Sequence, residues 1–430
     1  MKKVLIVSPH FPPINAPDMQ RVRVALSYFK EFGWEPTVLC VDANYIEAAQ
    51  DSWLEHSLPQ DIRIIKSKAF SAKLTRRFGF GSLSFRATPF LNAEGNKLLA
   101  REKFDVSFFS TTQFGVMSLA AKWRARYGLP YVLDIQDPWV SNYDYAKNAR
   151  PGGRLKYAVS QWSARRTEPV IAKGAAGIIS VSSAYVKDIE TRYPEIPAER
   201  FAVIPFAGAE HDFEFVQNTG IQQRVFNPSD GLTHWVYTGR GGSDLKKSLS
   251  GIFEALRQFR LRDPQSVNKI RIHFIGTSYA PEGRGEKSIE PVANEFGVAD
   301  LVKELPTRLP YFETLRCMLD AQALIIPGSD DAGYTASKIY PCILARKPIL
   351  AVFHEKSSVL TILNETNAGT GVDFSPSDST ETIAKKIVAT NWLSEGYLRT
   401  PETNWENFEP YLARSMTRSV CQILDKAITR

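Results

Sequence analysis

The stretch that decides the fold runs from Ile325 to Phe353 and reads IIPGSDDAGYTASKIYPCILARKPILAVF. Apolar runs at Ala323–Ile326 and Ile349–Phe353 enclose a glycine-containing loop and a helical segment, Thr335–Ala345. Both runs are continuously apolar, as parallel strands covered on both faces should be. The stretch therefore predicts a strand, a loop, a helix and a second strand of an α/β protein.

The same alternation of short apolar runs and helical segments extends along most of the chain. In the first part, strands are predicted at Val4–Val7, Thr37–Val41, Ile62–Ile65, Val106–Phe109, Tyr131–Ile135, Gly177–Val181 and Ala202–Ile204. In the second part, they are predicted at Trp235–Thr238, Ile272–Ile275, Leu301–Leu305, Ala323–Ile326, Ile349–Phe353 and Thr370–Phe374. The clearest helices are Met19–Phe32, which Asp18 would cap and Gly33 would stop, and Leu245–Arg260.

The fold predicted from this pattern is α/β, with two Rossmann-like doubly wound domains that face a central cleft. We expect an N-terminal domain over residues 1–208, a polar connection over 209–231 and a C-terminal domain over 232–403. A final helical stretch, Trp405–Ile428, follows the last strand. It lies in residues 404–430, which we expect to return to the N-terminal domain.

Composition describes an ordinary globular protein of 430 residues with a net charge of +7. The basic residues are scattered, which leaves open a solvated surface or an interaction surface. The four cysteines are far apart in sequence, which fits a reducing cytoplasm. The apolar run Val4–Val7 is too short for a signal peptide, and no run of about 18 apolar residues predicts a membrane span. We therefore expect a cytoplasmic protein that does not bind nucleic acid.

The second domain carries the features of an anion site. Thr238-Gly239-Arg240-Gly241-Gly242 follows its first strand, where glycine lets the backbone approach a ligand and arginine can bind a diphosphate through two hydrogen bonds. Free amides around 336–338, the helix dipole and the Lys338 ammonium suit the same group. The residues expected to bind this ligand in the second domain are Gly239, Gly276, Ser329, Tyr334, Thr335, Ala336, Ser337 and Lys338, with Arg240 and Lys246 assigned to catalysis.

The first domain offers two loops at strand ends. SPHFPPINAPDMQR, Ser8–Arg21, leads from the first strand into a helix, so Asn15, Ala16 and Arg21 are expected at an anionic ligand, although a plain connection remains open. DIQDPW, 134–139, follows the fifth strand, and Asp137 is a candidate general base or a turn residue. His10, Gln113 and Trp139 are the expected acceptor-binding residues.

At these residues the chain resembles glycosyltransferase family 4, whose members have the GT-B fold. The motifs that match the family occur in the same order and extend over nearly the whole chain. They are FPP followed by QR, FGWEPTVL, DPW, and SKIY with ARKPILA. The resemblance implies transfer from a nucleotide sugar, UDP- or GDP-linked, with retention of configuration and without a bound metal or other cofactor. It implies that an arginine and a lysine stabilise the departing diphosphate: Arg240 matches the arginine, while Lys246 lies one residue beyond the usual spacing.

Two departures from the family pattern keep other functions open. Asn15-Ala16 replaces a Gly-Gly pair, and Pro341 stands where the family often has a ribose-binding glutamate. The leading hypothesis is transfer to a polysaccharide or lipid-linked sugar of the cell envelope. The alternatives are a non-catalytic GT-B protein that binds a nucleotide or serves in an assembly, and a sugar-nucleotide epimerase, which the six histidines disfavour.

One segment suggests a peripheral membrane contact. KSKAFSAKLTRRFGFGSLSFR, residues 66–86, has no acidic residue and mixes cations with aromatics, as suits the surface of an anionic bilayer at the inner face of the membrane. Its cations are Lys66, Lys68, Lys73, Arg76, Arg77 and Arg86, and its phenylalanines are Phe70, Phe78, Phe80 and Phe85. Alternatively, the phenylalanines fill the core of the first domain.

Overall fold

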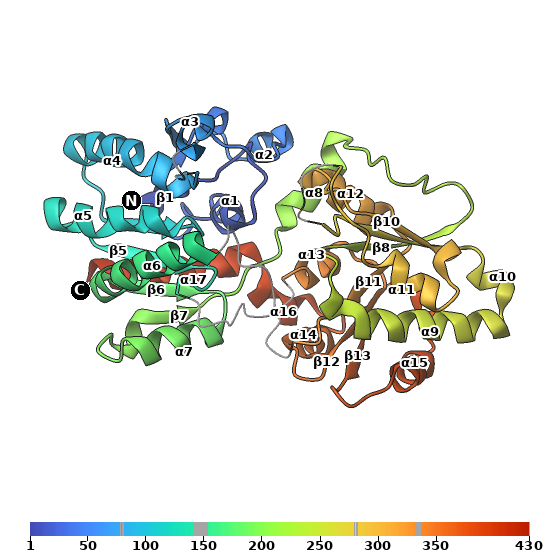
Figure 1. The fold of residues 1–430 in the computed structure, drawn as a ribbon. Coiled ribbons are helices and arrows are strands. Elements are labelled where there is room, and N and C mark those ends of the chain that lie inside the picture. Colours follow the sequence, from blue (N-terminus) through green and yellow to red (C-terminus); the bar gives the residue numbers. More distant parts are fainter. Residues whose placement is uncertain are drawn as a thin grey trace. The chain divides into compact units, whose positions relative to one another are not determined.

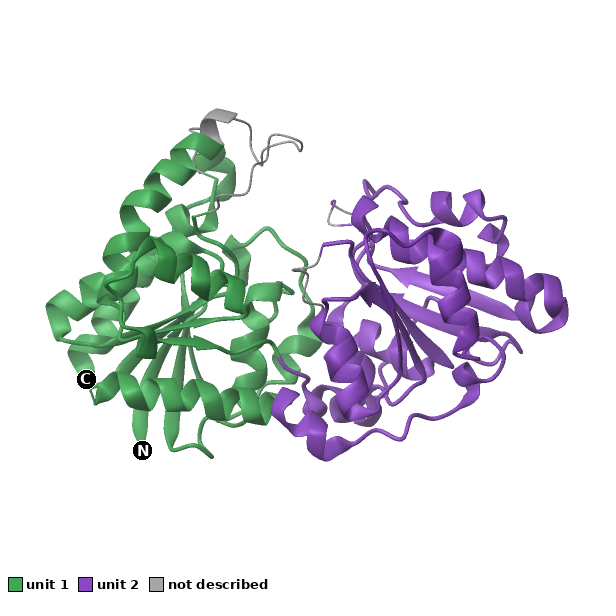
Figure 2. Ribbon diagram, turned by 90° about the horizontal axis from the view of Figure 1, so that it is seen from below, with its two compact units in different colours: residues 1–206, 413–430 green, residues 207–412 purple. Residues whose placement is uncertain are grey.

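The protein is described as a computed structural model. The structure describes residues 1–429 except 78, 80, 141–153, 279, 281, 282 and 332–336, and it leaves the side chains of 154–156 undescribed. The chain forms two compact units (Figure 2), residues 1–206 with 413–430, and residues 207–412. Each unit is a parallel β-sheet with helices on both faces, so the α/β prediction is confirmed.

Unit 1 has a seven-stranded sheet in the order β3-β2-β1-β4-β5-β6-β7, and its pairings are parallel (Figure 1). The strands are β1 (Lys2–Val7), β2 (Trp34–Val41), β3 (Arg63–Ser67), β4 (Val106–Ser110), β5 (Tyr131–Ile135), β6 (Gly177–Ser180) and β7 (Phe201–Val203). The order reverses beside β1, which pairs with both β2 and β4. In open parallel sheets, such a switch point is where ligands bind, outside the carboxyl ends of the strands.

The helices of unit 1 connect successive strands and bury the sheet. They are α1 (Gln20–Ala25), α2 (Ser52–His56), α3 (Ala72–Arg76), α4 (Leu83–Arg101), α5 (Ser118–Tyr127), α6 (Arg154–Gly174), α7 (Ser183–Arg192) and, from the end of the chain, α17 (Ala413–Ile428). The core lies between these helices and strands that are buried along most of their length, such as β4 and β5.

Unit 2 has a six-stranded parallel sheet in the order β10-β9-β8-β11-β12-β13. The strands are β8 (Thr233–Thr238), β9 (Ile270–Ile275), β10 (Val302–Leu305), β11 (Ala323–Pro327), β12 (Ile349–His354) and β13 (Thr370–Phe374). The helices are α8 (Glu210–Thr219), α9 (Lys246–Arg262), α10 (Pro264–Val267), α11 (Glu290–Glu295), α12 (Tyr311–Asp320), α13 (Ile339–Leu344), α14 (Ser358–Thr366), α15 (Thr380–Ala389) and α16 (Trp405–Phe408). Each strand predicted from the sequence is present, with ends that differ by a few residues.

The sequence-based helix predictions need three corrections. The helix expected at Met19–Phe32 is a short 3-10 turn, Pro17–Met19, followed by α1, which ends at Ala25, and Asp18 caps neither. The polar connection contains a helix, α8, that ends at Gly220 with φ of 66°. The helix expected from Thr335 begins at Ile339 in the described part of the chain, with Lys338 at its N-cap. Local pattern finds such helices but not their ends, which side-chain partners set.

The end of the chain returns to unit 1. Unit 2 ends at Leu412, and the chain then enters α17. This helix packs beside α1 and against β4, β5 and β6 (Figure 1). One face of this helix is buried, through Met416, Val420, Cys421 and Leu424 among others. Its Asp425 accepts a hydrogen bond from Trp34 Nε1 at 3.1 Å and pairs with Lys2.

Candidate functional site

The loop after β8 brings a lysine against the backbone of unit 2. A Cβ atom on Gly239 would lie 2.4 Å from Lys338 Nζ and 2.4 Å from Tyr237 Oη, so only glycine fits without displacing them. The Gly239 amide donates to the Ile275 carbonyl at 2.9 Å, which fixes the loop at the end of β9. The predicted pair of Gly239 and Lys338 is therefore brought together by the fold.

Arg240 is held in a defined orientation beside this loop. Its two terminal nitrogens donate to the two carboxylate oxygens of Asp244 at 2.7 and 2.5 Å. Burial alone would raise the pKa of Asp244, but hydrogen bonds from Arg240 and Ser329 hold that pKa below its usual value. Ser329 is buried at the end of β11, so the predicted residues Arg240 and Ser329 are connected through Asp244, which the sequence analysis did not identify.

Lys338 is the most perturbed cation of this site. Its ammonium lies over the Tyr237 ring, 5.7 Å from the centroid. Burial, followed by the positive charges of Arg308 and Arg240, lowers the pKa of Lys338 to about 8. Among the described residues, no carboxylate forms an ion pair with Lys338. Such a partly buried cation beside others is the electrostatic environment that a multivalent anion would stabilise.

Arg308 is a site residue that the sequence analysis missed. It follows β10 by three residues, and its Cγ lies 3.5 Å from where a Cβ on the predicted residue Gly276 would be. Gly276 has φ of 73°, a conformation that favours glycine. Since the carboxyl ends of β8, β9, β10 and β11 meet at one edge, a cation shortly after any of them was the available signal.

The remaining site residues predicted in unit 2 differ in their surroundings. Lys246 is exposed at the start of α9. Its Nζ lies 2.9 Å from Oε1 of Glu295, so its ammonium forms an ion pair on the surface. Ser337 is exposed, next to Lys338. Tyr334, Thr335 and Ala336 fall outside the described residues.

In unit 1 the segments that follow β1 and β4 surround the buried carboxylate of Asp18. Its Oδ1 lies 2.9 Å from Nδ1 of His10, and its Oδ2 accepts hydrogen bonds from Thr111 and Thr112. Burial would raise the pKa of Asp18, but His10 and these threonine donors lower it below its usual value. His10, predicted to bind an acceptor, is thus oriented by a residue that the sequence suggested only as a helix cap.

Asp137, the candidate base, lies close to this network. Its side chain is exposed, yet desolvation by surrounding protein atoms and then the negative charge of Asp18 raise the pKa of Asp137. The neighbouring Gln136 donates to the Asp18 carbonyl at 3.1 Å and to Asp134 at 2.9 Å. An accessible carboxylate whose pKa is raised toward neutrality is suited to exchanging a proton with a bound hydroxyl group.

Arg21 has a structural environment, in contrast to its predicted contact with an anionic ligand. It is 1% exposed, and its Nε lies 2.9 Å from Oδ2 of Asp134, itself fully buried. Its Nη2 donates to the Ile204 carbonyl at 2.6 Å. The guanidinium joins α1 to the ends of β5 and β7, because the helix directs Arg21 into the sheet rather than toward solvent.

The remaining predicted residues of unit 1 line the same end of the sheet in different ways. Asn15 is half-buried and donates its amide to the Ala49 carbonyl at 2.9 Å, while Ala16 is buried. Gln113 accepts a hydrogen bond from the Ser84 amide at 3.3 Å. Trp139 is buried and stacks on Phe114 with centroids 5.2 Å apart, so most of its surface belongs to the core.

No group of three or more His, Cys, Asp or Glu side chains in the described part of the chain is placed to hold a metal ion. Among the helices of the same residues, none combines the length and hydrophobicity that crossing a bilayer requires.

Part of the chain, including the segment after β5, is similar to a known family. Residues 20–207 match the family model of the glycosyl transferase 4-like domain. The matched region contains most of unit 1, including Gln136 and Asp137. A comparison with curated protein sequences finds no significant match.

Solved structures similar to the whole chain have the GT-B fold. Sucrose-phosphate synthase from Thermosynechococcus elongatus is 14% identical with a TM-score of 0.59, and each chain is covered completely. HepE of Anabaena, solved with UDP, is 13% identical with a TM-score of 0.59, over 99% of this chain and 100% of HepE. A putative UDP-N-acetylglucosamine 2-epimerase from Listeria monocytogenes is 12% identical with a TM-score of 0.52, over 99% and 96%. At these identities the likeness establishes the fold alone.

Proposed function

We propose that the protein is a glycosyltransferase that moves a sugar from a nucleoside diphosphate to a hydroxyl group of a polysaccharide or lipid-linked acceptor. The observation that carries the proposal is the group of cations at the strand ends of unit 2, Arg240, Arg308 and Lys338. The family match of residues 20–207 and the GT-B fold, which HepE shares in complex with UDP-glucose, support it.

In this proposal the cations act on the leaving group. The bond between the anomeric carbon and the β-phosphate oxygen breaks while the acceptor oxygen bonds to that carbon. Negative charge grows on the diphosphate, where Arg240, Arg308 and Lys338 stabilise it electrostatically. The acceptor proton passes to a carboxylate, for which Asp137 is the candidate, or to the departing phosphate. We propose retention of configuration, following the family resemblance.

A panel of nucleotide sugars tests the donor assignment. Lys338→Ala and Arg240→Ala should each weaken binding or turnover by about 1.5–3 kcal/mol, because each removes a charge-assisted contact. Lys246→Ala is the matched control, since its ammonium pairs with Glu295 on the surface, and it should behave as wild type. Wild-type binding by both site variants, or an equal loss in the control, would refute the assignment.

We further propose that turnover needs no metal ion, since three cations already surround the leaving group. Activity should persist in a chelator. Loss of activity that manganese or magnesium restores would contradict this.

A second candidate, a non-catalytic nucleotide-binding protein, is favoured by two observations. Pro341 lies inside α13 and offers no carboxylate to a ribose, and Lys246 points to Glu295 rather than to the glycine loop. The same panel separates the candidates: binding without transfer or hydrolysis favours the second, whereas release of a free nucleoside diphosphate favours the first.

We also propose that the segment 66–86 contacts an anionic membrane, which would suit a lipid-linked acceptor. Phe70, Leu74 and Phe85 are 44%, 57% and 49% exposed, so these two phenylalanines do not fill the core. Lys68, Lys73 and Arg77 are exposed beside them, whereas Arg86 is buried and donates to the Tyr45 and Phe70 carbonyls. Phe78 and Phe80 lie outside the described residues.

Sedimentation with phosphatidylserine vesicles tests the membrane contact. Lys73→Glu with Arg77→Glu should abolish binding at low salt, since each cation near such a surface contributes about 1 kcal/mol. Lys122→Glu with Arg126→Glu on α5 changes the net charge equally and should bind as wild type. Absence of wild-type binding at low salt, or equal loss in both pairs, would reject this surface.

A further inference from the structure

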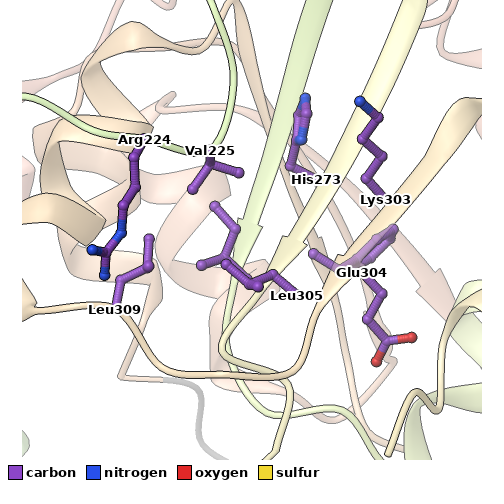
Figure 3. A pocket seen from close by; sticks show the side chains of 9 residues that line it. Arg224, Val225, His273, Lys303, Glu304, Leu305 and Leu309 are labelled. Carbon is purple, nitrogen blue, oxygen red and sulfur yellow. The ribbon is translucent and has the colours of Figure 1, made fainter. Parts of the chain in front are cut away.

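Strand β10 carries a buried carboxylate, Glu304, that the proposed transfer reaction does not use. Lys303 and Glu304 line a pocket beside β9 and β10, and their side chains leave the strand in opposite directions (Figure 3), as successive residues of a strand do. Lys303 is exposed, whereas Glu304 is only 6% exposed. A carboxylate in such surroundings needs hydrogen-bond donors from the protein itself.

Both oxygens of the Glu304 carboxylate accept hydrogen bonds. Oε1 accepts from the Thr277 hydroxyl at 2.6 Å and from the Ser288 amide at 3.0 Å. Oε2 accepts from the amides of Ile289 and Glu290 at 2.8 and 2.9 Å. Thr277 follows β9 closely, and the three amides lie where the chain enters α11. Glu304 therefore fastens both ends of the connection between β9 and α11 to β10.

The two residues that bind Oε1 of Glu304 also contact the glycine loop after β8. The Thr277 carbonyl accepts the Gly241 amide at 2.7 Å. A Cβ atom on Gly241 would lie 2.2 Å from the Ser288 hydroxyl oxygen and 3.3 Å from Cβ of Thr277, so both residues pack directly on this backbone. One carboxylate oxygen thus holds two contacts of Gly241.

These contacts help to fix the peptide group between Arg240 and Gly241. Its N–H makes the hydrogen bond to Thr277, and its carbonyl oxygen accepts the Tyr237 hydroxyl at 2.9 Å. Because a peptide group is planar, hydrogen bonds at both of its polar atoms determine its orientation. The guanidinium of Arg240 is held separately, by Asp244. The backbone and the side chain of this arginine are therefore both held by the fold.

We propose that Glu304 is a positioning residue of the diphosphate site. Through Thr277 and Ser288 it holds the glycine loop in the conformation that presents Arg240 to the ligand. This inference rests on the proposed function. A loop that is ordered before binding loses less conformational freedom when the ligand arrives, so the affinity is higher. Where the binding conformation is only partly populated, the apparent affinity falls by that fraction.

Glu304→Gln tests this role at nearly constant side-chain size. In either orientation its NH₂ group faces hydrogen-bond donors, because both carboxylate oxygens are acceptors. Without ligand, amide hydrogen exchange at Gly241, measured by NMR on the full chain, should become about tenfold faster, the value of one net hydrogen bond. The Gly239 amide, which donates to Ile275, should keep its rate. The affinity for UDP, measured by calorimetry, should fall about tenfold.

Glu254→Gln is the matched control. Glu254 is 5% exposed and accepts hydrogen bonds from Arg257 and Gln258 within α9. Its substitution should leave both the Gly241 exchange rate and the UDP affinity unchanged. Thr277→Val keeps the test decisive if Glu304→Gln does not fold. It removes only the hydroxyl donor to Oε1 and should change both readouts in the same direction as Glu304→Gln.

The outcomes distinguish this inference from the proposed function. If the wild type binds UDP and Glu304→Gln binds it equally well, the positioning role is overturned. An unchanged exchange rate at Gly241, or equal effects of Glu304→Gln and Glu254→Gln on both readouts, would also overturn it, because Glu304 would then serve stability alone. Absence of UDP binding by the wild type would refute the proposed function, and this inference with it.

Discussion

At the scale of single residues, the candidate donor site depends on how closely a few atoms approach. Lys338 is held between Gly239, Tyr237 and two other cations, in surroundings that disfavour its charge. An anionic ligand reverses this preference, because it replaces the missing countercharge.

The first prediction concerns pH. The lowered pKa of Lys338, about 8, means that the side chain is charged below that pH and loses its charge as the pH rises through it. The affinity for UDP should therefore fall between pH 7 and pH 9.5, measured by calorimetry. In Lys338→Arg, which stays charged, the affinity should vary little over this range. A wild-type affinity that is flat over this range would refute the role of Lys338.

The second prediction concerns Gly239. Its replacement by alanine places a methyl group 2.4 Å from Lys338 Nζ and from Tyr237 Oη, so both must move. The backbone at Gly239 does not have a positive φ, so the fold itself should tolerate alanine. We expect weaker UDP binding with a thermal midpoint close to wild type. A large drop in that midpoint with unchanged binding would show that the glycine serves packing rather than the site.

At the scale of elements, buried charges fasten the strand ends of unit 1. The Arg21 guanidinium joins α1 to β5 through Asp134 and to β7 through Ile204. Removing one member of a buried ion pair leaves an uncompensated charge and typically costs 3–5 kcal/mol. Arg21→Ala should lower the free energy of unfolding by about this amount, measured by denaturant titration. Intact stability with lost nucleotide binding would instead restore the role first expected from the sequence.

The Asp18 network predicts a coupling between two carboxylates. Because the negative charge of Asp18 contributes to the raised pKa of Asp137, Asp18→Asn should lower that pKa and move the acid limb of the pH–rate profile downward. The variant should also lose about 1–3 kcal/mol of stability, since buried donors on Thr111 and Thr112 lose an ionised partner. The folded pKa of Asp18 is depressed, so its contribution to stability is present above the unfolded pKa and disappears as the pH falls through the folded pKa. An acid limb that stays in place would separate Asp137 from catalysis.

At the scale of the whole molecule, unit 1 is completed by the far end of the chain. Leu424 of α17 is fully buried, whereas the nearby Gln422 is exposed. Leu424→Ala should destabilise the protein by about 2–5 kcal/mol through lost burial and a cavity, and Gln422→Ala should be close to neutral in thermal unfolding. Equal effects of the two substitutions would contradict the packing of α17 on this unit.

The sequence by itself determined the two parallel sheets, because a strand buried on both faces must be continuously apolar and that pattern is local. It also indicated Gly239, Arg240 and Lys338, since the carboxyl ends of parallel strands are known once the strands are. Only the tertiary structure decided where long side chains point. Arg21 turns into the core toward Asp134, Lys246 turns out to Glu295, and Arg308 joins Lys338, because the partners of each lie tens to hundreds of residues away. The direction of a charged side chain depends on the charges and the free volume around it. Residues distant in the sequence set both, so a local sequence pattern does not predict them.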